Sequence, residues 1–339
     1  MARAQAIVTR PGIPRRRLKI LGVVIAVGFI AIGVWKVTHA SHPALPLIVG
    51  VDDDTLKWTP FPLTVVRREQ SVGASAVRVW VPWNGEIRPT AVRRVELSRA
   101  ETAARTTTVV LAVFGFGAQT PTAPWAQRRF CTYAKAALAL VPNARAVVVW
   151  NEANSPTYWR GTPAQYESLL ARCYDALHSQ HVQVLDSTAS AHAPIRFLDA
   201  LAATYRDSGR TRPLVDAFGH NPYPLTPTEL PTVVHRGDFL GEADYTRLVS
   251  TLEAFGRTPS IWYLEDGFQT TKITPAQQAR DVTTAVDMAV CQPLVHAFFN
   301  FELVDETRVA GWHSGLIWRG GRMKPAAAAF AHAPRRCHT

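Results

Sequence analysis

The stretch VVVWNEANSP (147–156) decides how the rest of the chain is interpreted. Four apolar residues, three of them β-branched, end on Asn151 and Glu152, and a turn-forming Asn-Ser-Pro follows. A short continuous apolar run is typical of a strand that is buried on both faces, as in a parallel sheet covered by helices. The pattern therefore predicts a buried strand that places the carboxyl group of Glu152 at its carboxyl end.

Similar apolar runs recur along the chain from residue 47 onward. Eight are present, at 47–51, 76–81, 106–114, 144–150, 182–186, 214–219, 260–264 and 295–301. Amphipathic stretches between them predict helices at about 61–73, 90–104, 125–141, 163–178, 194–208, 243–256, 275–291 and 324–332. Strands that alternate with helices pair in parallel, so eight such units predict an α/β fold, a closed (β/α)8 TIM barrel. An open doubly wound sheet is the alternative, because periodicity does not distinguish the two.

Residues 1–40 do not follow this pattern. They contain seven basic residues, no acidic one, and an apolar run from Ile20 to Trp35. Such a segment is typical of a signal peptide, here with Ala40 as a weak cleavage site, or of an uncleaved membrane anchor, which the long basic region favours. The sequence therefore predicts a basic cytoplasmic region over 1–19, a signal anchor or signal peptide over 20–40, and an extracytoplasmic barrel domain over 41–339.

The basic character of the chain comes largely from this N-terminal segment. The formal net charge is +11, but without residues 1–40 the chain has 30 basic and 26 acidic residues, a net charge of +4. No run of Lys and Arg with interleaved aromatic residues follows residue 41, so nucleic-acid binding is not expected. The segment FGFGAQ (114–119) lacks the third glycine of dinucleotide-binding loops. No cofactor and no metal site are predicted.

Four cysteines allow disulfides in an exported protein. Cys131 and Cys173 fall on the third and fourth predicted helices, Cys291 ends the seventh, and Cys337 follows the eighth. Consecutive helices are neighbours in a barrel, so we expect the pairs Cys131–Cys173 and Cys291–Cys337. Four unpaired, buried thiols are the alternative, since the sequence gives no distances between the cysteines.

Two glutamates stand where a barrel would place catalytic groups. Active-site side chains in (β/α)8 barrels lie at the carboxyl ends of the strands, and both Glu152 and Glu265 end apolar runs. Partial burial at such a position raises the pKa of a carboxyl group towards the range that suits a general acid. Either glutamate alone would be interpreted as a solvated loop carboxylate, whereas the pair indicates acid–base chemistry.

The residues around these glutamates resemble those of a known group of enzymes. WNEAN (150–154) resembles the acid/base motif on strand four, and IWYLEDG (261–267) the nucleophile motif on strand seven, of retaining glycoside hydrolases of clan A, the cellulase- and xylosidase-like TIM-barrel glycosidases. HNPYP (220–224) is similar to the strand-six segment of this clan, and Arg78 matches its strand-two arginine. The resemblance covers residues 47–332, with the motifs in the expected order.

The resemblance implies a site and a reaction. Glu265 would be the nucleophile and Glu152 the acid/base in a double displacement on a β-linked oligosaccharide or polysaccharide, with the two carboxyl groups about 5–5.5 Å apart. Asn151 would bind the sugar 2-hydroxyl, Tyr223 would donate a hydrogen bond to Glu265, and Arg78 would complete the polar surroundings. His220 would contact the substrate, with a packed, hydrogen-bonded histidine as the alternative.

Aromatic side chains supply the expected sugar platforms. The clan usually has a tryptophan at the end of strand eight, where this chain has Phe301. We therefore expect Phe301, Trp83, Trp150 and Trp312 to contact the sugar. The missing tryptophan leaves a second function open, a non-catalytic carbohydrate-binding barrel of the cell envelope, while a purely structural barrel is less consistent with the two glutamates.

Overall fold

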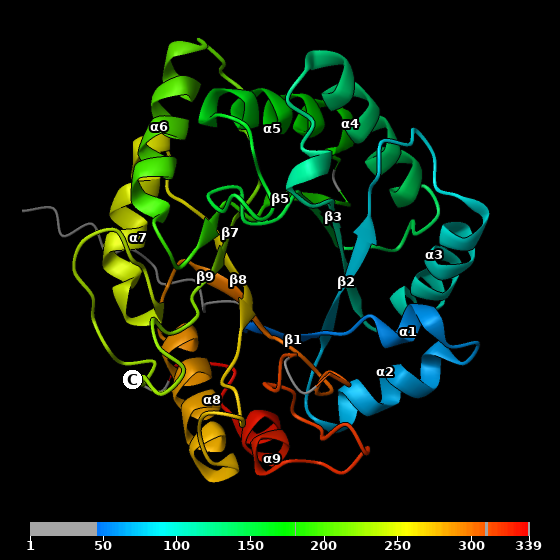
Figure 1. The fold of residues 1–339 in the computed structure, drawn as a ribbon, viewed down its shortest axis with the longest axis vertical. Helices are drawn as coiled ribbons and strands as arrows, with labels where there is room; N and C mark the ends of the chain where they lie inside the picture. Colours follow the sequence, from blue (N-terminus) through cyan, green and yellow to red (C-terminus); the bar gives the residue numbers. More distant parts are fainter. Residues whose placement is uncertain (1–45, 180, 309–310, 338–339) are drawn as a thin grey trace, which may run out of the picture. The chain divides into compact units, whose positions relative to one another are not determined.

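The computed structural model describes residues 46–179, 181–308 and 311–337. In these residues the strands form a ring with helices outside it (Figure 1). The strands are β1 (Ile48–Asp52), β2 (Ala76–Pro82), β3 (Thr108–Phe114), β4 (Ala146–Val149), β5 (Gln183–Asp186), β6 (Ala189–Ser190), β7 (Phe218–Asn221), β8 (Ile261–Asp266) and β9 (Val295–Asn300). Neighbouring strands pair in parallel in the order β5-β4-β3-β2-β1-β9-β8-β7-β6.

The two ends of this strand order meet. The two-residue strand β6 follows β5 after a short interruption and pairs with β7. Leu185 on β5 also forms a parallel bridge with Ala217, which directly precedes β7. Strands β5 and β6 thus occupy one position of the ring, which gives the described chain eight positions, as in a TIM barrel. The fold predicted from the alternation of strands and helices is confirmed as an α/β, TIM-barrel-like fold.

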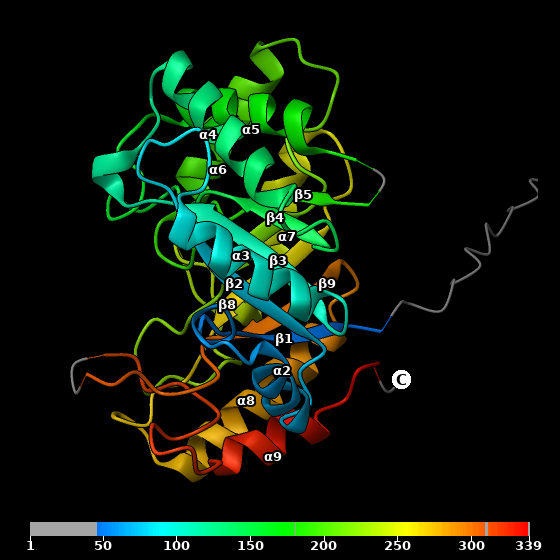
Figure 2. The same ribbon diagram turned by 90° about the vertical axis from the view of Figure 1, so that its right-hand side faces the viewer.

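The helices follow the strands, as expected. They are α1 (Thr55–Trp58), α2 (Pro62–Ser71), α3 (Ala91–Ala104), α4 (Pro124–Leu138), α5 (Pro163–Leu177), α6 (Pro194–Asp207), α7 (Tyr245–Leu252), α8 (Pro275–Val290) and α9 (Pro325–His332). Thr162 and Thr274 cap α5 and α8, each accepting a hydrogen bond from the backbone N–H three residues later, and a proline follows each cap. Figures 1 and 2 both show α9 beside α8, so the last helix closes the outer layer.

The structure corrects the sequence prediction at the sixth strand. The apolar run 214–219 predicts a strand that ends before His220, but β7 spans Phe218–Asn221 and so includes His220 and Asn221. The segment that leads into β7 is irregular. The N–H of Asp216 donates to the carbonyl of Val184, and regular pairing with β8 begins only at Phe218. Helix α1 was not predicted. It begins at Thr55, whose N–H and hydroxyl donate hydrogen bonds to the carboxylate of Asp53, both at 2.8 Å.

Both expected disulfides are present. Cys131 on α4 is bonded to Cys173 on α5, and Cys291, after α8, is bonded to Cys337, after α9. The paired residues are 42 and 46 positions apart. Closing loops of this length removes about 4 kcal/mol of chain entropy from the unfolded state in the simple loop model. The bonds therefore fasten neighbouring helices on the outside of the barrel.

The predicted signal or anchor segment lies outside the described residues. Regions 1–19 and 20–40, together with the candidate cleavage site at Ala40, precede the first described residue. Within the described part of the chain, no helix combines the length and apolar character needed to cross a membrane.

Candidate active site

A cleft of about 1320 Å³ opens over the strands and is lined by both predicted catalytic glutamates. Its lining comes from the ends of most strands of the ring. From the predicted site residues it includes Arg78, Asn151, Glu152, Tyr223, Glu265, Phe301 and Trp312. Residues more than 200 positions apart in the sequence thus meet in one cavity, as expected for the strand ends of a parallel barrel.

Two neighbours bind the carboxyl oxygens of Glu265 on β8. Its Oε1 forms an ion pair with Nη1 of Arg78 at 2.8 Å, and its Oε2 accepts a hydrogen bond from the hydroxyl of Tyr223 at 3.3 Å. Burial and the charge of Glu265 raise the pKa of Tyr223 well above its usual value. The tyrosine therefore remains a hydrogen-bond donor, and both oxygens of the Glu265 carboxylate are engaged by donors.

Arg78 connects four strand ends around this carboxylate. Its Nη1 also lies 2.6 Å from Asp52 on β1, and its Nη2 donates to Oδ1 of Asn151 at 3.0 Å. Burial opposes the charge of Arg78, but Asp52 and Glu265 outweigh it and raise the pKa of the guanidinium above its usual value. One permanent cation is therefore shared between two buried carboxyl groups. Burial, opposed by Arg78, raises the pKa of Asp52.

Glu152 reaches the cleft through a sharp turn of the chain after β4. Trp150 and Glu152 both adopt left-handed backbone conformations, with φ of 70° and 38°. Such conformations are rare for residues other than glycine and need support from their surroundings. Trp150 provides part of this support, because its buried ring donates a hydrogen bond from Nε1 to the carbonyl of Tyr158 at 2.9 Å. The turn directs the Glu152 side chain into the cleft.

The surroundings of Glu152 differ from those of Glu265. Its Oε1 accepts one hydrogen bond, from Nδ2 of Asn221 at 3.0 Å. Burial and the nearby charge of Glu265 raise the pKa of Glu152 to about 7, while the bond from Asn221 and the charge of Arg78 act in the opposite direction. One carboxyl group of the cleft is thus paired with a cation, whereas the other has a raised pKa and can hold and release a proton near neutrality.

Three predicted substrate contacts are not on the cleft wall. His220 is 1% exposed, and its two ring nitrogens lie 2.9 and 3.0 Å from the carbonyls of Ala189 and Leu240. Burial lowers its pKa to about 4, so it is the packed, neutral histidine of the alternative interpretation. Trp83 and Trp150 are also buried, and their rings pack edge to face with each other and with Phe130 on α4. All three side chains are packed inside the protein and do not line the cleft.

The other two predicted platforms do line the cleft. The rings of Phe301 and Trp312 pack edge to face at 5.5 Å, and Tyr223 lies 5.2 Å from Trp312. Trp312 is 37% exposed. These three rings, which we call the β9-side cluster, occupy the side of the cleft next to Glu265, where the clan has its strand-eight tryptophan.

Several cleft residues were not included in the predicted site. They include Asp52, Trp80, Phe114, Phe116, Tyr158 and Glu302. One signal was available for Trp80: it stands two positions after Arg78 on the same strand, so both side chains point to the same face. Asp52 lies directly opposite Arg78 in the register of β1 and β2, a relation that the sequence alone does not give.

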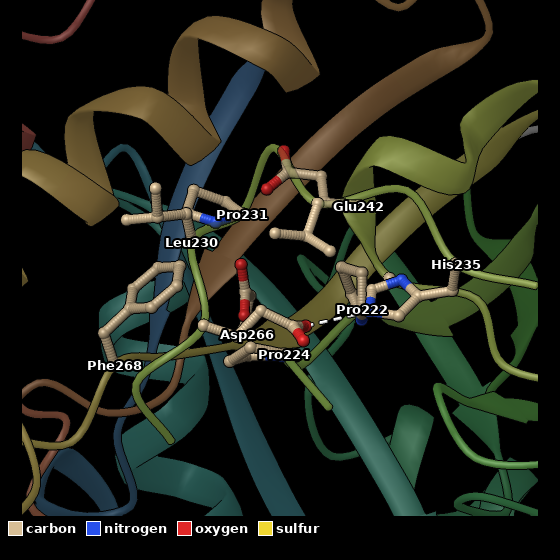
Figure 3. Close-up of a pocket in the computed structure, with 11 residues that line it drawn as sticks. Pro222, Pro224, Leu230, Pro231, His235, Glu242, Asp266 and Phe268 are labelled. Atoms are coloured by element: carbon tan, nitrogen blue, oxygen red, sulfur yellow. Dashed lines mark hydrogen bonds and ion pairs between the residues drawn. The ribbon is translucent and has the colours of Figure 1, made fainter. Parts of the chain in front are cut away.

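A smaller pocket lies on the other side of β8 (Figure 3). Asp266 follows Glu265 and faces this pocket together with Glu242. Burial raises the pKa of both carboxyl groups, to about 8 for Asp266. Figure 3 also shows the ring of His235, which lies 2.9 Å from Glu229 in the same loop. These groups belong to the support behind the strand, because successive side chains of a strand point to opposite faces.

Comparison with known proteins identifies the fold. No protein-family model and no curated protein matches the sequence. A family 39 glycoside hydrolase from Bacteroides cellulosilyticus WH2 is similar in structure, with a TM-score of 0.67 and 17% identity over 84% of this chain, which spans 63% of that protein. A family 5, subfamily 18 glycoside hydrolase from Streptomyces cattleya, in complex with GlcNAc, has a TM-score of 0.63 and 20% identity, with 86% of this chain and 80% of that chain covered.

A third solved structure is more distant. A family 128 endo-β-1,3-glucanase from Amycolatopsis mediterranei, in complex with laminarihexaose, has a TM-score of 0.53 and 15% identity, with 85% of this chain and 99% of that chain covered. The structural neighbours are thus glycoside hydrolases of clan A, and this chain shares their TIM-barrel fold. At these identities the likeness establishes the fold, so the activity has to be argued from the site itself.

Proposed function

We propose that the protein is a retaining glycoside hydrolase that cleaves β-linked O-glycosidic bonds by double displacement, with Glu265 as nucleophile and Glu152 as acid/base. The observation that carries the proposal is the contrast between the two carboxyl groups in one cleft. Glu265 is paired with Arg78 and Tyr223, whereas the pKa of Glu152 is raised to about 7. A retaining glycosidase needs one ionised and one protonated carboxyl group on either side of the bond.

In the first step the carboxylate of Glu265 attacks the anomeric carbon. The bond from this carbon to the glycosidic oxygen breaks, and the proton of Glu152 moves to that oxygen, so the leaving sugar departs as a neutral alcohol. The product is an ester between Glu265 and the remaining sugar. Arg78 and Tyr223 position the attacking oxygens, and Asn151 is available to the sugar 2-hydroxyl beside them.

In the second step Glu152 acts as a base. Its pKa is raised in part by the negative charge of Glu265, and this charge disappears when the ester forms. The pKa of Glu152 therefore falls in the intermediate, which suits a carboxylate that must take a proton from water. The water oxygen attacks the anomeric carbon, the ester bond breaks, and Glu265 regains its charge. Two displacements at the same carbon leave its configuration unchanged.

We further propose that the reaction takes place outside the cytoplasm. The basic and apolar segments at 1–19 and 20–40 have the composition of an export signal or anchor. The two disulfides are consistent with an oxidising compartment. The substrate is then an oligosaccharide or polysaccharide of the cell surface or its surroundings.

Covalent labelling tests the mechanism. The protein is incubated with activated 2-fluoro-β-glycosides of glucose, mannose, galactose and xylose, whose electron-poor rings slow the second step, and is then digested and analysed by mass spectrometry. We expect a sugar on the peptide that contains Glu265, and no label in E265Q. Binding of sugars by the folded protein without label or turnover would instead support the non-catalytic carbohydrate-binding barrel.

A further inference from the structure

A second group of aromatic rings lines the cleft away from the β9-side cluster. Trp80 stacks on Phe114 with ring centroids 5.3 Å apart, and Phe116 stacks on Tyr158 at 5.7 Å. The two stacks meet edge to face, at 5.8 Å between Trp80 and Phe116 and 5.8 Å between Phe114 and Tyr158. We call these four residues the β2–β4 cluster, since they stand on β2, at and after the end of β3, and after β4.

This cluster leaves apolar surface open to the cleft. All four residues line it, and Phe116 is 47% exposed. Trp58, on the short helix α1 beside the cluster, also lines the cleft and is 59% exposed. Contiguous exposed aromatic surface in a cleft is costly in water and marks a binding site more often than a structural one. The cluster therefore offers flat apolar faces to a ligand.

The rings are held in place before any ligand arrives. The backbone N–H of Trp80 donates to the carboxylate of Asp54 at 2.9 Å, and its indole N–H donates to the carbonyl of Phe114 at 3.2 Å. The buried ammonium group of Lys57 donates to the backbone carbonyl of Trp80. The loops that carry Phe116 and Tyr158 are joined by a bond from the N–H of Gly117 to the carbonyl of Thr157 at 2.8 Å. A surface fixed in this way loses little entropy on binding.

Each aromatic cluster lies beside one of the two glutamates. In the ring order Tyr158 of the β2–β4 cluster belongs to the segment after β4 that also carries Glu152, and the β9-side cluster flanks β8, which carries Glu265. A glycosidic bond placed between the two carboxyl groups would thus have one aromatic cluster on each side. The cleft volume of about 1320 Å³ also exceeds the roughly 300–1,000 Å³ of typical small-ligand pockets.

We propose that the β2–β4 cluster is a sugar-binding subsite for the leaving-group side of the substrate, and that the protein acts on a chain of several sugar units. Placing this subsite on the leaving-group side rests on the proposed function, in which Glu152 protonates the oxygen of the leaving group. Pyranose rings have apolar C–H faces that pack on aromatic rings, so the cluster takes a neutral, equatorially substituted sugar chain. Asn154 and Ser155 lie on the same wall and are polar.

Binding to chains of increasing length tests this subsite separately from catalysis. The affinities of cello-, manno-, laminari- and chito-oligosaccharides of two to six units are measured by calorimetry with E265Q, in which turnover is blocked. We expect one series to bind more tightly with each added unit. F116A then weakens the hexasaccharide about fivefold, the scale of one aromatic stacking contact. W125A is the matched control, because Trp125 is 62% exposed on α4 and does not line the cleft.

The possible results separate the two proposals. Affinity that does not depend on length, no binding of any series, or equal weakening by F116A and W125A would overturn the subsite. Length-dependent binding that is lost in F116A supports it even if the wild-type protein hydrolyses none of these chains, and that result would count against the catalytic proposal alone. In wild-type protein, the same subsite predicts a kcat/KM that rises with chain length.

Discussion

Arg78 and Glu265 form a buried ion pair across the barrel, from β2 to β8, at 2.8 Å. Asp52 competes for the same guanidinium nitrogen at 2.6 Å. One nitrogen of the Arg78 guanidinium thus contacts two carboxyl groups, those of Glu265 and Asp52. One of them, Glu265, is the nucleophile of the proposed mechanism, and the pKa of the other, Asp52, is raised by burial.

This arrangement predicts unequal effects of two substitutions. R78A leaves the buried charge of Glu265 without a partner, which we expect to destabilise the fold by about 3–5 kcal/mol and to abolish activity. D52N retains an oxygen that can accept a hydrogen bond from Arg78, so its unfolding free energy should change by less than about 2 kcal/mol. Urea denaturation measures both. Equal losses in the two variants would contradict the role given to Arg78.

The activity should fall on the alkaline side of pH 7. The first step needs the proton of Glu152, and the pKa of this group is raised to about 7. The rate of glycosyl transfer to Glu265 should therefore decline as pH rises through this value. A pH profile of kcat/KM on an aryl glycoside with a poor leaving group measures it, whereas a substrate whose leaving group needs no proton should lose this limb. A limb common to both substrates would assign the titration to another group.

Asn221 should set the position of that limb. Its amide donates to Glu152 at 3.0 Å and thereby lowers the pKa of the carboxyl group. In N221A this donor is gone, so the alkaline limb should move to higher pH, while N84A, at an exposed loop position, should leave it in place. A shift of the alkaline limb to lower pH in N221A would contradict a hydrogen bond from Asn221 to the ionised Glu152.

The fold and the two glutamates could be predicted from the sequence because their signals are local. Each apolar run that ends in a carboxylate is visible within a few residues, the two glutamates together indicate acid–base chemistry, and eight alternations of strands with helices indicate an α/β fold such as a barrel. The sugar platforms could not be predicted in the same way. Trp80 shares a strand face with Arg78, two positions earlier, whereas Trp83 and Trp150 directly follow β2 and β4 and are buried, Trp150 with a left-handed backbone.

The remaining errors have a related cause. His220 was expected at the cleft because HNPYP resembles the strand-six segment of the clan, but its ring is buried between the carbonyls of Ala189 and Leu240. Asp52 meets Arg78 only through the register of β1 and β2. Register and turn conformation arise from contacts between distant parts of the chain, and the sequence does not specify them locally.

The disulfides should contribute separately to stability. Replacing both cysteines of one bond by alanine, C131A/C173A or C291A/C337A, should lower the unfolding free energy by about 2–4 kcal/mol, because each bond closes a loop of similar length. Denaturation with and without a reductant measures this. Reduction should destabilise the wild-type protein by more than either double variant. Wild-type stability that does not respond to a reductant able to open both bonds would contradict this expectation.

Glu69 on α2 should make stability depend on pH. Its side chain is 1% exposed, and neither carboxyl oxygen has a hydrogen-bond partner among the described residues. Burial, with a smaller effect of Asp53, raises the pKa of Glu69 from 4.5 to about 9. A carboxyl group that holds its proton more tightly in the folded state stabilises the fold fully below pH 4.5, and this contribution is lost as pH rises towards 9.

E69Q carries an uncharged group of the same shape, so its stability should not decline with pH for this reason. We expect the unfolding free energy of the wild-type protein to fall between pH 5 and pH 9 relative to that of E69Q, measured by urea denaturation across the range. E253Q, at an exposed position, serves as the matched control and should follow the wild-type curve. If E69Q and E253Q both follow it, Glu69 is solvated in the folded protein, and its surroundings on α2 must open to water.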